Sequence, residues 1–143
     1  MDVAAPPETR ARTAIAAGVL AVLGGLWFLT GIVWVSLVLG FGQHDLLVPG
    51  QLTDAVIGLL LLLGGTSLLA RVEAGRILCL AAAVLALAAT IVDMVLRYQL
   101  VFLIVGGPTG LGEPGLRMVV IAVPFVALLV LAALPATRRW TRL

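Results

Sequence analysis

The chain has 143 residues, of which 62% are hydrophobic and only 11% are charged. Soluble domains carry about 25% charged residues, so the composition excludes an ordinary soluble domain and indicates one domain embedded in a membrane. The formal charge of +2 comes from nine arginines without any lysine. In a membrane protein such charges set the orientation in the bilayer, and we expect no nucleic-acid partner. The abundance of alanine, leucine, valine and arginine is typical of a high-GC bacterial genome, so we expect a bacterial protein.

A short polar arm, residues 1–12, opens the chain and carries two prolines and four charged side chains. The apolar run that follows, residues 13–40, is about twice as long as the hydrophobic part of a cleavable signal peptide, which has about 7–15 residues. We therefore interpret this run as a first membrane-spanning helix that is not removed.

Small residues recur along this first helix at four-residue spacing, at Ala17, Ala21 and Gly25. Small side chains allow two helix backbones to approach closely where no hydrophobic effect drives helices together. We predict that these residues form a helix-packing face, either inside the protein or against another chain.

The connection after the first helix contains His44 next to Asp45 and has no arginine. A histidine oriented by an acid can serve as a base or as one metal ligand. A zinc site needs three or four ligands, and the chain has no second histidine. We interpret His44 as a loop residue and expect no metal and no cofactor bound by this chain alone.

The second and third apolar runs, residues 53–70 and 77–100, are separated only by residues 71–76. A connection this short requires two antiparallel neighbouring helices. The third run contains Asp93 and Arg97, which share one helix face because they are four residues apart. Ionisable residues within such an apolar stretch indicate a functional site by default.

The fourth apolar run, residues 116–135, contains Pro124 near its middle, where we predict a kink because proline removes one backbone donor. The glycine-rich segment before it, residues 106–115, lacks the lysine of a phosphate-binding loop. Residues 138–143 form a basic tail. Each apolar run meets or approaches the length of about 20 residues that a spanning helix needs, and exposed backbone is not tolerated in hydrocarbon. The sequence therefore predicts an all-α, four-helix membrane bundle over residues 13–137.

Arginine placement predicts the orientation of this bundle. With four spans, both ends of the chain and the connection between the second and third helices lie on one side of the membrane. These segments hold seven of the nine arginines: Arg10, Arg12, Arg71, Arg76, Arg138, Arg139 and Arg142. The positive-inside rule makes that side cytoplasmic. We therefore expect a multi-pass inner-membrane protein with both termini in the cytoplasm.

Four charged residues are predicted to lie at one height near the outer boundary of the membrane. If Ala70 lies opposite Ile77, equal residue counts place Asp54 level with Asp93. Arg117 lies 21 residues before Arg138, and Arg97 lies 21 residues after Arg76, so these two arginines are also level. The predicted ring is Asp54, Asp93, Arg97 and Arg117. We consider three interpretations of this outer charge ring. Its members are helix-end residues with snorkelling arginines, or a clamp that holds three helices together, or a site for an ion or a ligand.

No catalytic residues stand out in the chain. Cys79 is the single cysteine, which excludes an internal disulfide and a Cys-x-x-Cys redox pair. The serines lack a neighbouring base. We therefore expect no enzymatic activity of the chain by itself.

One segment, Gly58 to Arg71, resembles the second helix of DoxX-like four-helix membrane proteins. The resemblance covers about a tenth of the chain and implies no activity. Small multidrug transporters share the size and the helix count, but they depend on a glutamate within the first helix. The first helix here has no acid, which argues against that family.

These features favour a non-catalytic accessory or assembly subunit of a larger membrane complex, in contact with the lipid bilayer. The first alternative is a small homo-oligomeric transporter or ligand-binding membrane protein that uses the outer charge ring. The second alternative is a subunit of a membrane enzyme that shares the cofactor of a partner.

Overall fold

The structure, a computed structural model, describes residues 7–39, 47–96 and 114–141. Within these ranges the chain forms five α-helices and no strand, which confirms the predicted all-helical class. The helices are α1 (Pro7–Leu39), α2 (Leu47–Leu69), α3 (Glu73–Leu96), α4 (Pro114–Ala133) and the short α5 (Pro135–Trp140).

Each long helix begins between two and six residues before the apolar run that predicted it. Hydropathy marks only the part of a helix that lies in hydrocarbon, whereas the backbone hydrogen bonds continue into the polar region. Pro7 and Pro114 open α1 and α4, and proline suits the first helical position because its missing N–H has no partner there. Residues 7–12 of the predicted polar arm are thus part of α1.

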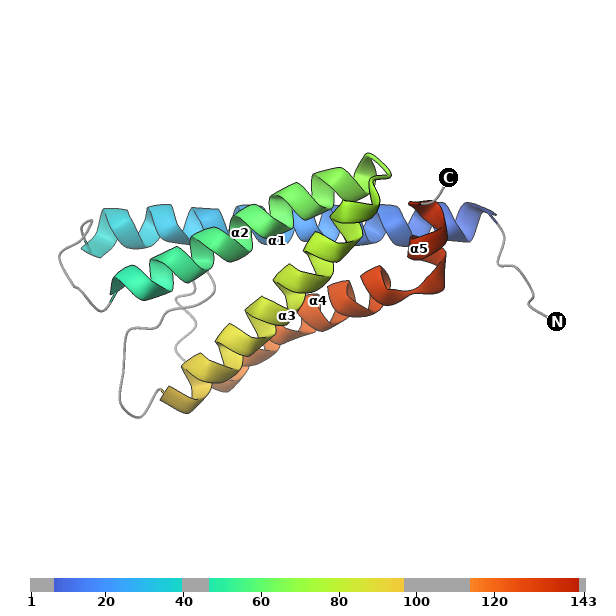
Figure 1. The fold of residues 1–143 in the computed structure, drawn as a ribbon. Coiled ribbons are helices and arrows are strands. Elements are labelled where there is room, and N and C mark those ends of the chain that lie inside the picture. Colours follow the sequence, from blue (N-terminus) through green and yellow to red (C-terminus); the bar gives the residue numbers. More distant parts are fainter. Residues whose placement is uncertain (1–6, 40–46, 97–113, 142–143) are drawn as a thin grey trace.

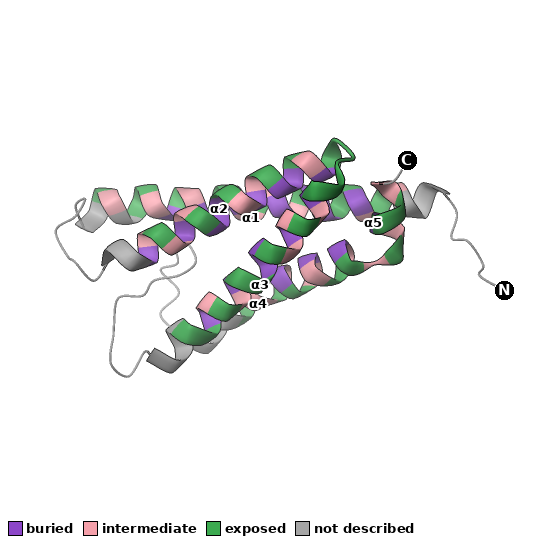
Figure 2. Cartoon of the chain, viewed as in Figure 1, coloured by how far each residue is buried: buried purple, intermediate pink, exposed green. Residues whose placement is uncertain are grey.

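Two pairs of helices make up the fold. α1 packs on α2, α2 on α3 and α3 on α4, and α1 also contacts α4. Figure 1 shows α1 and α2 as one pair and α3 and α4 as a second pair that crosses the first. The pairs are close at the end that holds the α2–α3 turn and diverge toward the other end. Buried residues lie where the pairs face each other, and the outer faces are exposed (Figure 2).

Glycines bring the backbones of α1 and α2 into contact. A Cβ atom added to Gly65 would lie 2.8 Å from the carbonyl oxygen of Gly18, and one added to Gly25 would lie 2.8 Å from the carbonyl oxygen of Gly58. The contact of Gly18 with Gly65 and the contact of Gly25 with Gly58 are seven residues apart on each of the two antiparallel helices. The same helix face is therefore used over two turns. A side chain larger than that of glycine would not fit at these positions between the two helices.

The α2–α3 turn is a Schellman motif with an arginine where glycine is usual. The Val72 N–H donates to the Ser67 carbonyl (2.9 Å) and the Arg71 N–H donates to the Leu68 carbonyl (3.1 Å), which is the pattern of that helix end. Arg71 has a φ of 64°, the left-handed conformation that costs a non-glycine residue about 1–2 kcal/mol. Gly75, in the first turn of α3, then lies against the backbone of Ser67 and Leu68.

A short helix closes this end of the molecule. α5 packs on α1 and also contacts α3 and α4. The guanidinium of Arg71 lies 4.1 Å from the ring centroid of Trp140, a cation–π contact. The Thr137 hydroxyl is buried and donates to the Leu131 carbonyl at 2.6 Å, fixing the corner between α4 and α5. Sequence reasoning missed α5 and treated residues 138–143 as a tail.

Among the described residues, three helices are long and apolar enough to cross a membrane, over Ala11–Trp34, Gly50–Leu69 and Glu73–Val92. α4 is 20 residues long. Its described apolar part, Ala122–Ala133, is shorter than a membrane span. The chain is thus a membrane protein by the length and composition of its helices, and the fourth span stays a prediction.

Candidate functional site: an apolar pocket between α1 and α4

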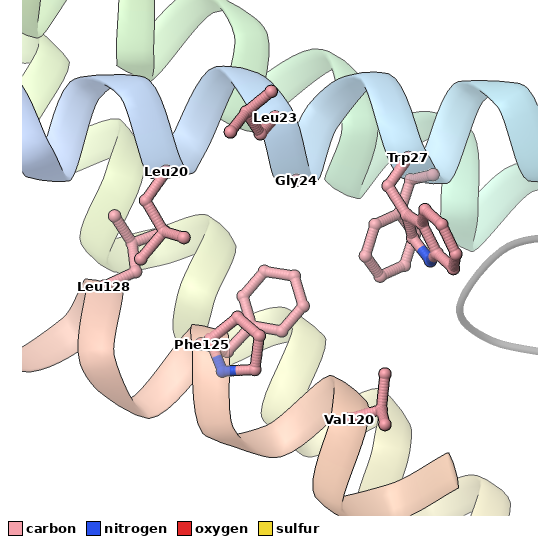
Figure 3. A pocket seen from close by; sticks show the side chains of 9 residues that line it. Leu20, Leu23, Gly24, Trp27, Val120, Phe125 and Leu128 are labelled. Atoms are coloured by element: carbon pink, nitrogen blue, oxygen red, sulfur yellow. The ribbon is translucent and has the colours of Figure 1, made fainter.

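A pocket of about 250 Å³ lies between α1 and α4. The lining side chains of α1 and α4 face each other across it (Figure 3). The side chains and backbone that line it come from these two helices alone: Leu20, Leu23, Gly24, Trp27, Phe28, Val120, Pro124, Phe125 and Leu128.

The inner wall of the pocket is built from three buried side chains, Phe28, Phe125 and Leu128. The rings of Phe28 and Phe125 meet edge to face, with centroids 5.6 Å apart and planes at 70°. This geometry is favourable for two aromatic rings. It also sets the distance between α1 and α4, because two large rings stand where α1 and α2 have only glycine.

The mouth of the pocket is formed by exposed side chains, Leu23, Trp27 and Val120. Leu20 and Leu128 approach each other at one end, whereas Trp27 and Val120 flank the other end (Figure 3). The pocket is therefore closed toward the arginine-rich end of the molecule, which holds the start of α1, the α2–α3 turn and α5, and it is open to the side. All lining side chains are hydrocarbon except the indole of Trp27, so the pocket suits an apolar ligand.

Three threonine side chains within the spans are bonded to their own helices. The hydroxyls of Thr30, Thr66 and Thr90 each donate to the carbonyl four residues earlier, at 2.7–2.8 Å. This local bond satisfies a threonine in a helix. These three hydroxyls therefore do not line a polar path through the bilayer.

The structure describes one side chain of the predicted charge ring, that of Asp54. It is buried, with 5% of its surface exposed, on the second turn of α2. The backbone of α3 reaches past Asp93 and that of α4 includes Arg117, but these two side chains and the whole of Arg97 lie outside the described residues. The ring stays a prediction.

The register of α2 and α3 differs from the one assumed for the ring. A Cβ added to Gly64 would meet the backbone nitrogen of Cys79 at 2.9 Å, so these two residues lie opposite each other. Ten residues outward from this contact, the count reaches Asp54 on α2 and Ala89 on α3. Asp93 is four residues farther, about 6 Å at 1.5 Å per residue. Counting from Ala70 and Ile77 makes Asp54 and Asp93 level, whereas counting from the observed contact of Gly64 with Cys79 does not.

The other residues that the sequence singled out have these positions. Ala17 and Ala21 are fully buried, and Ala21 and Gly25 lie against Gly65 and Gly58 of α2; the packing face of all three residues stays a prediction. Pro124 lies within a continuous α4 and lines the pocket; its kink stays a prediction.

Two residues considered for chemistry are placed as follows. Cys79 is buried against Gly64, and His44 lies outside the described residues. Within residues 7–39, 47–96 and 114–141 no three His, Cys, Asp or Glu side chains gather as a metal site would require.

Comparison with known proteins finds no matching family model, no matching curated protein and no matching solved structure. The resemblance of Gly58 to Arg71 to DoxX-like proteins therefore carries no further argument.

Proposed function

We propose that the chain is a non-catalytic accessory or assembly subunit of a larger complex in a bacterial inner membrane. The observation that carries the proposal is the distribution of polar and apolar groups on the three apolar helices. Thr30, Thr66 and Thr90 are bonded to their own backbones, and the outer faces present large aliphatic side chains. Such faces suit lipid and the transmembrane helices of a partner.

The internal packing supports the same proposal. The close contacts through Gly18, Gly25, Gly58 and Gly65 are made within the chain, so they give it a stable shape without a partner. The exposed faces of α2, α3 and α4 are then available for a second protein. We propose contact through these faces in either a larger complex or a homo-oligomer.

The topology proposed here has four spans and both termini in the cytoplasm. Every arginine whose side chain is described lies at the end that holds the start of α1, the α2–α3 turn and α5 (Figure 1). These residues are Arg12, Arg71, Arg76, Arg138 and Arg139. Positive charge marks the cytoplasmic side, which supports this orientation.

Co-purification tests the subunit proposal. The tagged chain, expressed at its native level and extracted in a mild detergent, should elute with a larger partner. Recovery only as a free chain in several detergents would contradict the proposal. To find the contact face, Leu63→Phe, Val84→Phe and Val126→Phe each enlarge one exposed side chain on a different helix. One of them should release the partner, and unchanged elution of the free chain serves as the folding control.

A transporter or ligand-binding role of the charge ring is a second candidate, favoured by the burial of Asp54. A carboxylate held away from water in a span is costly and is commonly functional. Chloride and sodium fluxes into vesicles that contain the purified chain should then fall in Asp54→Asn. Fluxes equal to those of protein-free vesicles in the unmodified chain would contradict this role.

A further inference from the structure

We propose that the pocket between α1 and α4 binds the distal half of one acyl chain of a membrane lipid. This inference goes beyond the subunit role and does not depend on it. It rests on the depth of the pocket in the membrane, the chemistry of its walls, its size and the position of its mouth.

The pocket lies close to the middle of the bilayer. The apolar stretch of α1 runs from Ala11 to Trp34, so its midpoint falls between Val22 and Leu23. Leu20 then lies about 4 Å to the arginine side of the midplane and Phe28 about 8 Å to the other side, at 1.5 Å per residue along the axis. The hydrocarbon core is about 30 Å thick. What surrounds the mouth is therefore lipid tail rather than headgroup or water.

The walls suit a ligand without polar groups. Phe28, Phe125 and Leu128 form the buried wall, and none of them has a hydrogen-bonding atom. A polar ligand would lose its bonds to water here without replacement, at a cost of about 2–7 kcal/mol for each unpaired group. A saturated or monounsaturated chain has no hydrogen bonds to lose on entry.

The size of the pocket selects a single chain over a protein helix. An engineered apolar cavity of about 150 Å³ accommodates benzene, so the 250 Å³ found here corresponds by proportion to about ten carbon atoms. One turn of a helix about 10 Å wide and 5.4 Å long occupies about 420 Å³. The pocket is too small for that turn and is of the right order for the outer half of an acyl chain.

The position of the mouth gives the direction of entry. Leu20 and Leu128 close the pocket toward the arginine-rich end, and Trp27 and Val120 flank its other end (Figure 3). The lipid therefore belongs to the leaflet opposite that end. Its methyl terminus lies against Phe125 and Leu128, and its headgroup lies beyond the outer half of α1.

Fluorescence of Trp27 reports directly on this site. The probe is a phosphatidylcholine with bromine near the methyl ends of its chains, added at trace amounts to the full chain in detergent micelles. A variant with Trp34→Phe and Trp140→Phe keeps Trp27 as the single tryptophan. Its quenching should saturate at about one lipid per chain, because one pocket takes one acyl chain. The same lipid brominated near its carbonyls should quench Trp27 less.

Two matched controls separate binding from general contact with lipid. Trp34 is on the same helix and similarly exposed (57% against 44% for Trp27) but does not line the pocket. As the single tryptophan, it should be quenched in proportion to the brominated lipid, without saturation. On α4, Val120→Phe fills the mouth, whereas Val130→Phe enlarges a side chain of similar exposure (51% against 42%) outside the pocket.

The proposal requires that Val120→Phe loses the saturable quenching of Trp27 and that Val130→Phe keeps it. Gly24→Leu is a second filling variant and should give the same loss; gel filtration and helical circular dichroism verify the fold of each variant. Quenching of Trp27 that only rises in proportion to the lipid would overturn the proposal. Equal quenching in Val120→Phe and Val130→Phe would do so as well.

Discussion

The two sides of α1 show how helices associate in two different ways within one small protein. Toward α2, Gly18 and Gly25 allow backbone to meet backbone. Toward α4, the rings of Phe28 and Phe125 hold the helices apart and leave a pocket beside them. Since lipid is as apolar as leucine, no hydrophobic effect drives either contact, and close packing supplies the stability. The glycine side should therefore carry most of the stability, and the aromatic side should admit lipid.

The largest expected effect comes from adding a methyl group where helix backbones meet at the α2–α3 turn. Gly75→Ala places a Cβ against the backbone of Leu68 and 2.6 Å from the carbonyl carbon of Ser67. Backbone cannot yield as a side chain can, so we expect a loss of about 3 kcal/mol in the free energy of unfolding, at the upper end of overpacking costs. Unfolding by sodium dodecyl sulfate, followed by circular dichroism, measures it. A loss below that of an exposed substitution would contradict the close approach.

A second comparison concerns two buried side chains, of which we expect the smaller to cost more stability when it is shortened to alanine. Leu68 is fully buried near the α2–α3 turn, and Leu68→Ala should cost about 2–3 kcal/mol, the lower end of the range for closed cores, because lipid offers no transfer term. Phe125→Ala removes a larger side chain, yet we expect only about 1 kcal/mol, mostly the loss of the ring pair, because lipid can fill the vacated space. The same unfolding assay compares the two variants. If Phe125→Ala proves the more costly, the pocket is not open to lipid.

The smallest effect concerns the end where α5 joins the two pairs. Arg71→Ala loses the contact with Trp140 but keeps the left-handed backbone, so we expect a loss of about 0.5–1 kcal/mol. Arg71→Gly loses the same contact but relieves about 1 kcal/mol of backbone strain, and its stability should stay close to that of the unmodified chain. Equal losses in both variants would show that the turn is unstrained at this position.

The sequence was sufficient to predict that the chain is helical and embedded in a membrane, since long apolar runs have no other stable state in lipid. It was less informative about helix ends. α1 begins at Pro7 rather than at residue 13, because a helix can extend through polar residues once it leaves the hydrocarbon. The start of α5 had a usable signal, Pro135 after Leu134, since proline favours the first helical position.

The pocket could not be found from the sequence. Leu20 and Leu23 line it, whereas Leu61 and Leu68 belong to the buried core and do not line it, and nothing in their local sequence separates the two groups. The difference arises from how far apart the helix axes lie, which depends on which residues of α1 and α4 meet. The charge ring was deduced from residue counts alone, and the register of Gly64 opposite Cys79 changes the relative heights of Asp54 and Asp93.

Two neighbouring glycines on α1 test the contrast between its sides most directly. A Cβ on Gly25 would lie 2.8 Å from the Gly58 oxygen, whereas one on Gly24 would lie 3.5 Å from a Leu61 methyl and 4.0 Å from the Phe125 ring. We predict that Gly25→Ala loses about 1–3 kcal/mol of stability and that Gly24→Ala, with its better helix propensity, is neutral or stabilised by up to about 1 kcal/mol. Equal destabilisation by the two substitutions, measured in the same unfolding assay, would contradict the account.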